Sequence, residues 1–220
     1  MTMFDKIKPI VLTVLICAAT LLRTAPADAA PLETLTVAGG CFWCVEADFE
    51  KVPGVAEVVS GFTGGQVADP SYKQVTAGGT GHYEAVQISF DPSIVTREKL
   101  LEMFLRSVDP TDASGQFCDR GDSYRTAIFV SDPGQKASAE AIKTEAQAEL
   151  GKTIVTPILS EGPFFPADES HQDYYKSAKI ILTRFGPKRR SEAYKLYRSA
   201  CGRDERVRAL WGASAPFAGS

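Results

Sequence analysis

The sequence predicts a two-layer α/β fold with a mixed central sheet, formed by one domain at residues 30–220. Strand patterns alternate with helical patterns along the chain, and about 190 residues are enough for one full hydrophobic core. The 220-residue chain is 44% hydrophobic and carries a formal net charge of −3. A mildly acidic chain does not suit a polyanion, so we expect no nucleic-acid partner.

Residues 1–29 are typical of a cleaved signal peptide. Lys6 and Lys8 form a basic start, the apolar run Ile10–Leu22 is short for a membrane span, and Ala27-Asp28-Ala29 is a small-x-small cleavage pattern. We therefore expect export, to the periplasm if the cell has an outer membrane and otherwise outside the cell. No stable membrane association is expected after cleavage, and an uncleaved anchor is the alternative.

The first half of the mature chain contains three strand patterns and three helical ones. Alternating apolar residues favour strands, and a Gly pair after 62 and Asp91-Pro92 after 90 would end two of them. Thr96 is a suitable N-cap for a helix with a single apolar face. The expected elements are strands at 34–37, 55–62 and 83–90, helices at 42–51 and 96–108, and a helical turn at 72–76.

The second half continues the alternation. Asp132-Pro133 is a helix start and Gly151 a helix end, so a long helix is expected between them. The expected elements are strands at 124–130 and 153–159, the helix at 133–150, a helical segment beginning at His171, and a basic terminal helix at 191–211 that is interrupted near Cys201-Gly202.

The segment Gly39–Glu46 contains the strongest functional signal. It places Cys41 where a strand gives way to a helix, and backbone N–H groups at a helix N-terminus stabilise a thiolate. We therefore expect Cys41 to have a lowered pKa and to act as a nucleophile. Phe42 and Trp43 would present an apolar wall beside it.

Four cysteines remain after Cys17 leaves with the signal: Cys41, Cys44, Cys118 and Cys201. An even number of cysteines in an oxidising compartment is compatible with structural disulfides. A chain of this size does not need such cross-links, so redox-active cysteines are an equally serious interpretation. Two further alternatives stay open. A general dithiol–disulfide oxidoreductase would use Cys41 and Cys44, and a zinc-binding interaction module would use all four cysteines as ligands.

Five motifs follow one another along the mature chain. They are Gly40-Cys41-Phe42-Trp43-x-Val45-Glu46, Asp69-Pro70-Ser71-Tyr72, Gly79-Thr80-Gly81-His82-x-Glu84, Asp119-Arg120-Gly121-x-x-Tyr124-Arg125 and His171-Gln172-x-Tyr174. With these motifs in this order, the chain resembles the A-type peptide methionine sulfoxide reductases, from about Thr34 to about Cys201. From this resemblance we expect a ferredoxin-like plait with a C-terminal helical or coil tail.

The resemblance implies reduction of the S epimer of methionine sulfoxide, in proteins, peptides or the free amino acid. Cys41 would become a sulfenic acid as methionine is released, and Glu84 would donate a proton to the sulfoxide oxygen. Tyr72 and Tyr124 would hydrogen-bond that oxygen, and Asp119 would organise the network. Phe42 and Trp43 would bind the S-methyl group.

The sequence departs from the family pattern at two cysteines. Cys44 stands where the family commonly has Gly, and Cys118 where it commonly has Asn. The resemblance makes Cys201, on a mobile tail, the first choice for the resolving thiol. Cys44, on the same helix face as Cys41, and Cys118 are the alternatives.

We expect no metal and no bound organic cofactor, because neither His82 nor His171 has a ligand-like partner at zinc spacing. His171 is interpreted as structural, capping the helix that follows it. Electrons would come from a thioredoxin-like protein, or from dithiothreitol in vitro, and the protein is expected to be a monomer whose substrates are oxidised proteins or peptides.

Overall fold

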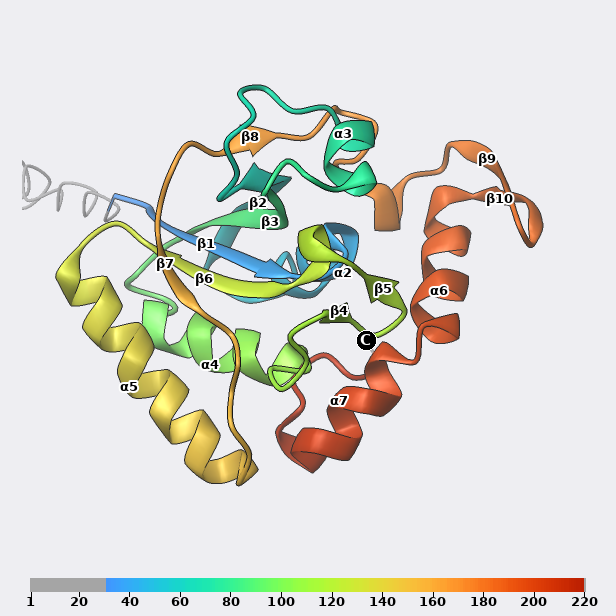
Figure 1. Ribbon diagram of the computed structural model, residues 1–220. Helices are drawn as coiled ribbons and strands as arrows, with labels where there is room; N and C mark the ends of the chain where they lie inside the picture. Colours follow the sequence, from blue (N-terminus) through green and yellow to red (C-terminus); the bar gives the residue numbers. More distant parts are fainter. Residues whose placement is uncertain (1–30, 220) are drawn as a thin grey trace, which may run out of the picture. The chain divides into compact units, whose positions relative to one another are not determined.

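Six strands form a mixed sheet in the order β7-β6-β1-β3-β2-β8 (Figure 1). The computed structural model describes residues 31–219, and the predicted signal segment 1–29 lies outside them. Neighbouring strands are antiparallel except for β6 and β7, which are parallel. The sheet strands are β1 (Glu33–Gly39), β2 (Val55–Thr63), β3 (Tyr83–Phe90), β6 (Thr126–Val130), β7 (Ile158–Ser160) and β8 (Phe165–Pro166).

Six α-helices accompany the sheet within the described residues. Their starts follow the predicted chemistry: the Thr96 side chain accepts from the Lys99 N–H, and the Asp132 side chain accepts from the Gln135 N–H. No helix within residues 31–219 is both long and apolar enough to cross a bilayer. The helices are α2 (Phe42–Phe49), α3 (Tyr72–Ala77), α4 (Arg97–Ser107), α5 (Pro133–Leu150), α6 (Arg190–Ala200) and α7 (Arg203–Trp211).

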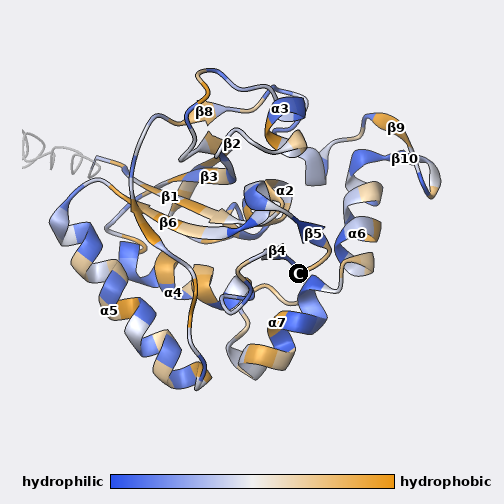
Figure 2. Ribbon diagram, in the orientation of Figure 1, coloured by the Kyte–Doolittle hydropathy of each residue, from blue (hydrophilic) through white to orange (hydrophobic). Residues whose placement is uncertain are grey.

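The main core lies between one face of the sheet and helices α2, α4, α5 and α7. Leu35 and Val37 of β1 point into it, whereas Ala38 belongs to a smaller cluster on the opposite face with Phe129. Orange apolar strands and blue outward faces of α5 and α7 show the same division in Figure 2. The predicted mixed sheet with helices packed on it is therefore confirmed.

Three expected elements differ from the structure. Residues 153–157 are irregular and only Ile158–Ser160 forms a strand, because the Val155 N–H bonds to the Pro110 carbonyl instead of a sheet neighbour (2.8 Å). The expected strand 124–130 begins at Thr126, after a 3₁₀ turn at Asp122–Tyr124. The helix expected from His171 is wrong, since only a 3₁₀ turn at Tyr174–Lys176 is present.

In addition to β8, four short strands were not predicted. They pair as β4 (Gly115–Gln116) with β5 (Asp119–Arg120), and β9 (Ile180–Thr183) with β10 (Gly186–Arg189). The predicted interruption of the terminal helix is confirmed. Gly202, at φ 68°, separates α6 from α7, a conformation that glycine adopts readily.

Buried charges attach the two terminal helices to the rest of the fold. The Arg203 side chain is 2% exposed and donates to the carbonyls of Gly39 (3.2 Å) and Ser107 (3.0 Å). Arg198 donates to the Asp48 carboxylate on α2 (2.9 Å), which is also fully enclosed. A polar group enclosed in this way stabilises the fold only with its partners in place.

We predict that Arg203→Met lowers the free energy of unfolding by about 3 kcal/mol, because two buried carbonyls and the Asp48 carboxylate lose a donor or a counter-charge. Urea denaturation measures it. Arg208→Met, at an exposed position on α7, is the matched control and should change stability by less than about 0.5 kcal/mol. Equal midpoints for the two variants would contradict the role given to Arg203.

Candidate active site

Cys41 occupies the N-cap of α2, directly after β1. Its backbone is not helical (φ −50°, ψ 115°) and its thiol makes no capping bond. The turn depends on Gly40, whose φ is 80° and where an added Cβ would come within 2.6 Å of Gln116 Cβ. The sequence thus places the cysteine as predicted, half-buried between the end of β1 and the start of α2.

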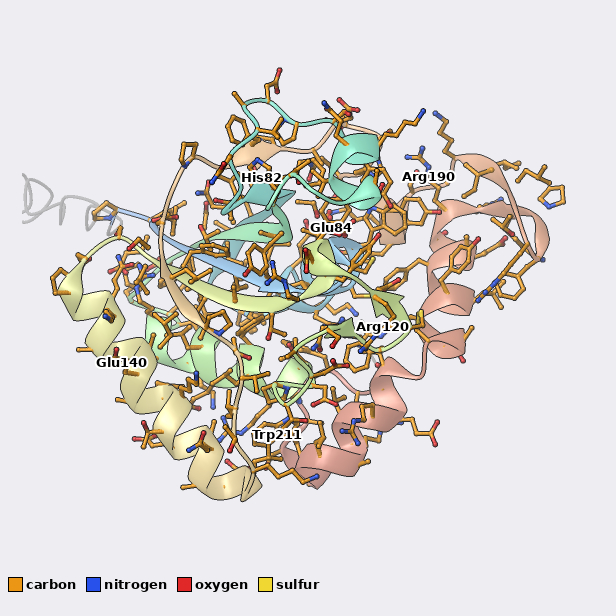
Figure 3. The ribbon with its side chains drawn as sticks, viewed as in Figure 1. His82, Glu84, Arg120, Glu140, Arg190 and Trp211 are labelled. Atoms are coloured by element: carbon orange, nitrogen blue, oxygen red, sulfur yellow. A yellow bond between two sulfur atoms is a disulfide. The ribbon has the colours of Figure 1, made fainter. Side chains whose placement is uncertain are left out.

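Glu84 lies on β3, inside the molecule and against the start of α2 (Figure 3). Its side chain is 1% exposed, and Oε2 accepts from the Phe42 N–H at 3.1 Å. Among residues 31–219, Oε1 has no hydrogen-bond partner. Burial raises the pKa of Glu84 to about 8, so the carboxyl is mostly protonated at neutral pH and can donate from its free oxygen.

Two tyrosines and an aspartate complete this cluster. The Tyr72 hydroxyl on α3 is hydrogen-bonded to Tyr124, and burial, followed by the charge of Glu84, raises the pKa of both phenols. Burial also raises the pKa of Asp119 on β5. The charges of Asp119 and Cys41 act on both tyrosines as well. The structure therefore brings together all five side chains predicted to be catalytic.

Trp43 forms one wall of the site, but Phe42 does not line it openly. The Trp43 ring is partly exposed and stacks on Tyr174 with centroids 3.9 Å apart. Phe42 is 1% exposed and packs behind, against Phe62 and Tyr72. Of the two predicted pocket residues, Trp43 is the one that contacts a cavity.

His171 and Tyr174 are part of the site and were not predicted as such. The His171 ring stacks on Tyr72 (4.2 Å) and on Trp43 (5.7 Å), so its interpretation as a helix cap is wrong. Burial lowers the pKa of His171, which keeps the imidazole neutral. The only sequence signal for these residues was their place in a family motif.

The loop that holds His171 and Tyr174 is fixed by two side chains. Gln172 accepts from the Ser60 N–H (2.9 Å) and donates to the Ser60 carbonyl (2.8 Å), so it bonds to β2 like a strand neighbour. Buried Glu46 on α2 accepts from the Asp173 N–H and from the Ser60 hydroxyl. This is why a loop without regular structure lies against Trp43.

The four described cysteines form two pairs. Cys118 and Cys201 are joined by a disulfide with Cα atoms 4.9 Å apart, while Cys41 and Cys44 are free thiols hydrogen-bonded to each other. All four line one cavity of about 400 Å³, together with Trp43 and other residues, among them Phe117, Asp119, Tyr174, Arg198 and Arg203. The four-thiolate ligand set of the zinc alternative is not available in this state.

The expected low pKa of Cys41 is wrong for this state of the protein. Its hydrogen bond to Cys44, burial, and the charges of Glu84 and Asp119 raise the pKa of Cys41. The same hydrogen bond lowers the pKa of Cys44 to about 7. Burial alone would raise this pKa, and the charges of Arg203 and Arg198 lower it further. Within this pair, Cys44 is therefore the thiol that loses its proton more readily.

The mobile tail expected for Cys201 is also not observed. Cys201 caps α6, where its N–H bonds to the Tyr197 carbonyl (2.9 Å), and it lies between buried Arg198 and buried Arg203. Cys201 is bonded to Cys118 and not to Cys41. Which thiol first meets an oxidised Cys41 therefore stays a prediction at this point.

A family model described as peptide methionine sulfoxide reductase matches residues 33–206. Over 191 residues the chain is 48% identical to peptide methionine sulfoxide reductase MsrA 2 of Caulobacter vibrioides, with 86% of this chain and 91% of that protein covered. It is 46% identical over 182 residues to MsrA of Listeria monocytogenes, with coverage of 82% and 96%.

Solved structures agree with this match. Reduced Mxr1 of Saccharomyces cerevisiae has a TM-score of 0.63 at 31% identity and covers 69% of this chain and 88% of its own. Methionine sulfoxide reductase A of Corynebacterium diphtheriae has a TM-score of 0.59 at 30% identity, with coverage of 67% and 75%. The site and these likenesses lead to one conclusion: the chain belongs to the peptide methionine sulfoxide reductase family, type A, and is a methionine sulfoxide reductase.

Proposed function

We propose that this enzyme reduces the S epimer of methionine sulfoxide, free or within peptides and proteins, through a sulfenic acid on Cys41. The observation that carries the proposal is the convergence on Cys41 of a protonated Glu84 with a free oxygen and two hydrogen-bonded tyrosine hydroxyls. A general dithiol–disulfide oxidoreductase has no use for these three oxygen groups around its thiol.

The proposed reaction needs a nucleophile and an acid within one pocket. The Cys41 sulfur attacks the sulfoxide, whose sulfur is reduced by two electrons as its oxygen is transferred, and the cysteine sulfur is oxidised by two electrons to the sulfenic acid. Glu84 donates a proton to that oxygen, and Tyr72 and Tyr124 donate hydrogen bonds as negative charge develops there. Asp119 supports the network, and Trp43 with Tyr174 surrounds the methyl group.

The topology supports the same assignment. The four inner strands lie in the order β6-β1-β3-β2 and are connected as β-α-β-β-α-β through α2 and α4. We assign this unit to the ferredoxin-like plait. The turn after its first strand is the position of Cys41.

Regeneration would proceed through an intramolecular disulfide that a thioredoxin-like dithiol reduces, with dithiothreitol as its substitute in vitro. Cys118 is exposed, so an external thiolate can reach this disulfide directly. We further propose a monomer that repairs oxidised proteins after export. N-terminal sequencing of protein from the periplasmic or secreted fraction checks the export, and a chain that still begins at Met1 would contradict it.

Cys41→Ser should abolish methionine formation from the S epimer, because a serine hydroxyl at neutral pH is a far weaker nucleophile than a thiolate. The measurement is methionine released from each purified epimer in the presence of dithiothreitol. Cys201→Ser, first reduced and then assayed without dithiothreitol, should still release one methionine per enzyme. More than trace activity in Cys41→Ser would move the nucleophile elsewhere.

The rate of the chemical step should fall as pH rises through about 8, because Glu84 is the acid only while protonated and burial holds its pKa there. Below that pH the protonated form dominates and the fall is absent. Single-turnover rates between about pH 6 and about pH 9.5 measure this fall. Glu84→Gln should be slower throughout and lack the descending limb. A limb that persists in this variant would assign it to another group.

Trp43→Ala should raise the substrate concentration needed for half-maximal rate by about tenfold, since the methyl group loses its apolar wall. Steady-state kinetics and thermal unfolding are both measured. Trp211→Ala is the matched control, because Trp211 is buried on α7 away from Glu84 (Figure 3) and should cost stability alone. Unchanged kinetics with lost stability in Trp43→Ala would show that Trp43 is only a packing residue.

A further inference from the structure

Cys41 and Cys44 are placed to react with each other. They occupy the N-cap and the first turn of α2, the Cys44 N–H bonds to the Cys41 carbonyl at 3.0 Å, and their side chains are hydrogen-bonded. Two cysteines three residues apart at the start of a helix lie on one face and can close a disulfide without moving a distant segment. Cys41 and Cys44 are the two free cysteines among residues 31–219.

Cys201 is not placed to react with Cys41 in the same way. It lies between Arg198, which donates to Asp48 on α2, and Arg203, which donates to the Gly39 carbonyl. Both arginine side chains are buried. Moving Cys201 to the Cys41 sulfur would disturb this buried charge cluster, whereas the reaction of Cys44 with Cys41 leaves the cluster in place.

The two cysteine pairs nevertheless share one space. The Cys118–Cys201 disulfide borders the inner cavity of about 400 Å³ that Cys41 and Cys44 line. The same disulfide borders a second, outer cavity with Asp109, Asp112 and Arg206. It can therefore be approached by the inner thiols on one side and by an external dithiol on the other.

We propose that Cys44 is the thiol that condenses with the Cys41 sulfenic acid. Cys118 and Cys201 then reduce the Cys41–Cys44 disulfide and become a disulfide themselves. This rests on the proposed sulfenic acid chemistry and departs from the choice of Cys201 made on the sequence. The described state, with the inner pair reduced and the outer pair oxidised, is the state that this exchange leaves behind.

The steps balance in atoms and electrons. The Cys44 sulfur bonds to the Cys41 sulfur, the S–O bond breaks, and the hydroxyl leaves as water with the Cys44 proton. A thiolate of the reduced outer pair then attacks the inner disulfide, and the second outer thiol displaces it from the mixed disulfide, which leaves Cys41 and Cys44 as thiols. An external dithiol reduces Cys118–Cys201, and its own two sulfurs become the disulfide.

The test uses the full chain with Cys118→Ser and Cys201→Ser combined, which removes the outer pair and keeps both inner thiols. After reduction and removal of the reductant, one equivalent of S-epimer methionine sulfoxide is added with dimedone, which traps sulfenic acids. We expect one methionine per enzyme, a Cys41–Cys44 bond within one tryptic peptide, and no dimedone adduct. Cys17 lies in a different tryptic peptide and does not interfere.

Adding Cys44→Ser to that variant is the matched control, and it should release the same methionine but carry dimedone on Cys41. Alone, Cys44→Ser should slow turnover with thioredoxin by more than about tenfold. A dimedone adduct on Cys41 while Cys44 is present would overturn the role of Cys44, and so would unchanged turnover of Cys44→Ser. Absence of methionine in every variant would instead reject the sulfenic acid chemistry itself.

Discussion

The buried charge cluster on the inner side of α2 is the constraint on which the active-site region depends. Asp48 has almost no contact with water, and its carboxylate is balanced by Arg198 and Arg203 from the two terminal helices. An isolated ion in such surroundings costs several kcal/mol, so the helices cannot leave without leaving that charge unpaired. The cluster thereby fixes Cys201 and puts two positive charges beside Cys44.

A second constraint acts on a buried carboxyl group that has no counter-charge beside it. Within residues 31–219, the one hydrogen bond that Glu84 makes is from the Phe42 N–H at the start of α2. Desolvation therefore dominates and favours the neutral acid. The two halves of the site thus use burial differently: near Cys44 paired charges stabilise an anion, and near Glu84 the lack of a partner preserves a proton.

Much of the fold from residue 33 to residue 150 could be predicted because its signals are local. Alternating apolar residues, the Thr96 and Asp132 caps and Gly151 each act on their own segment. The C-terminal part was harder. The β9–β10 hairpin exposes Ile180 and Leu182, so it lacks a clear buried face, and the chain near His171 is shaped by Gln172 bonding to a strand more than a hundred residues away.

The site shows the same distinction. Cys41, Tyr72, Glu84, Asp119 and Tyr124 were recognised from their motifs, and the fold brings them together. The stacking of His171 on Tyr72 depends on a loop position that no local pattern encodes. The pKa of Cys41 was misjudged because it depends on one neighbour, Cys44, whose charge two distant arginines stabilise.

The Cys118–Cys201 disulfide joins residues 83 positions apart. A cross-link that closes a loop of this length restricts the unfolded chain and, in the loop-closure model, stabilises the fold by about 4.5 kcal/mol. Thermodynamic reciprocity requires that folding strengthen the disulfide by the same amount. The protein with this disulfide closed is thus more resistant to heat and proteolysis than the protein with Cys118 and Cys201 reduced.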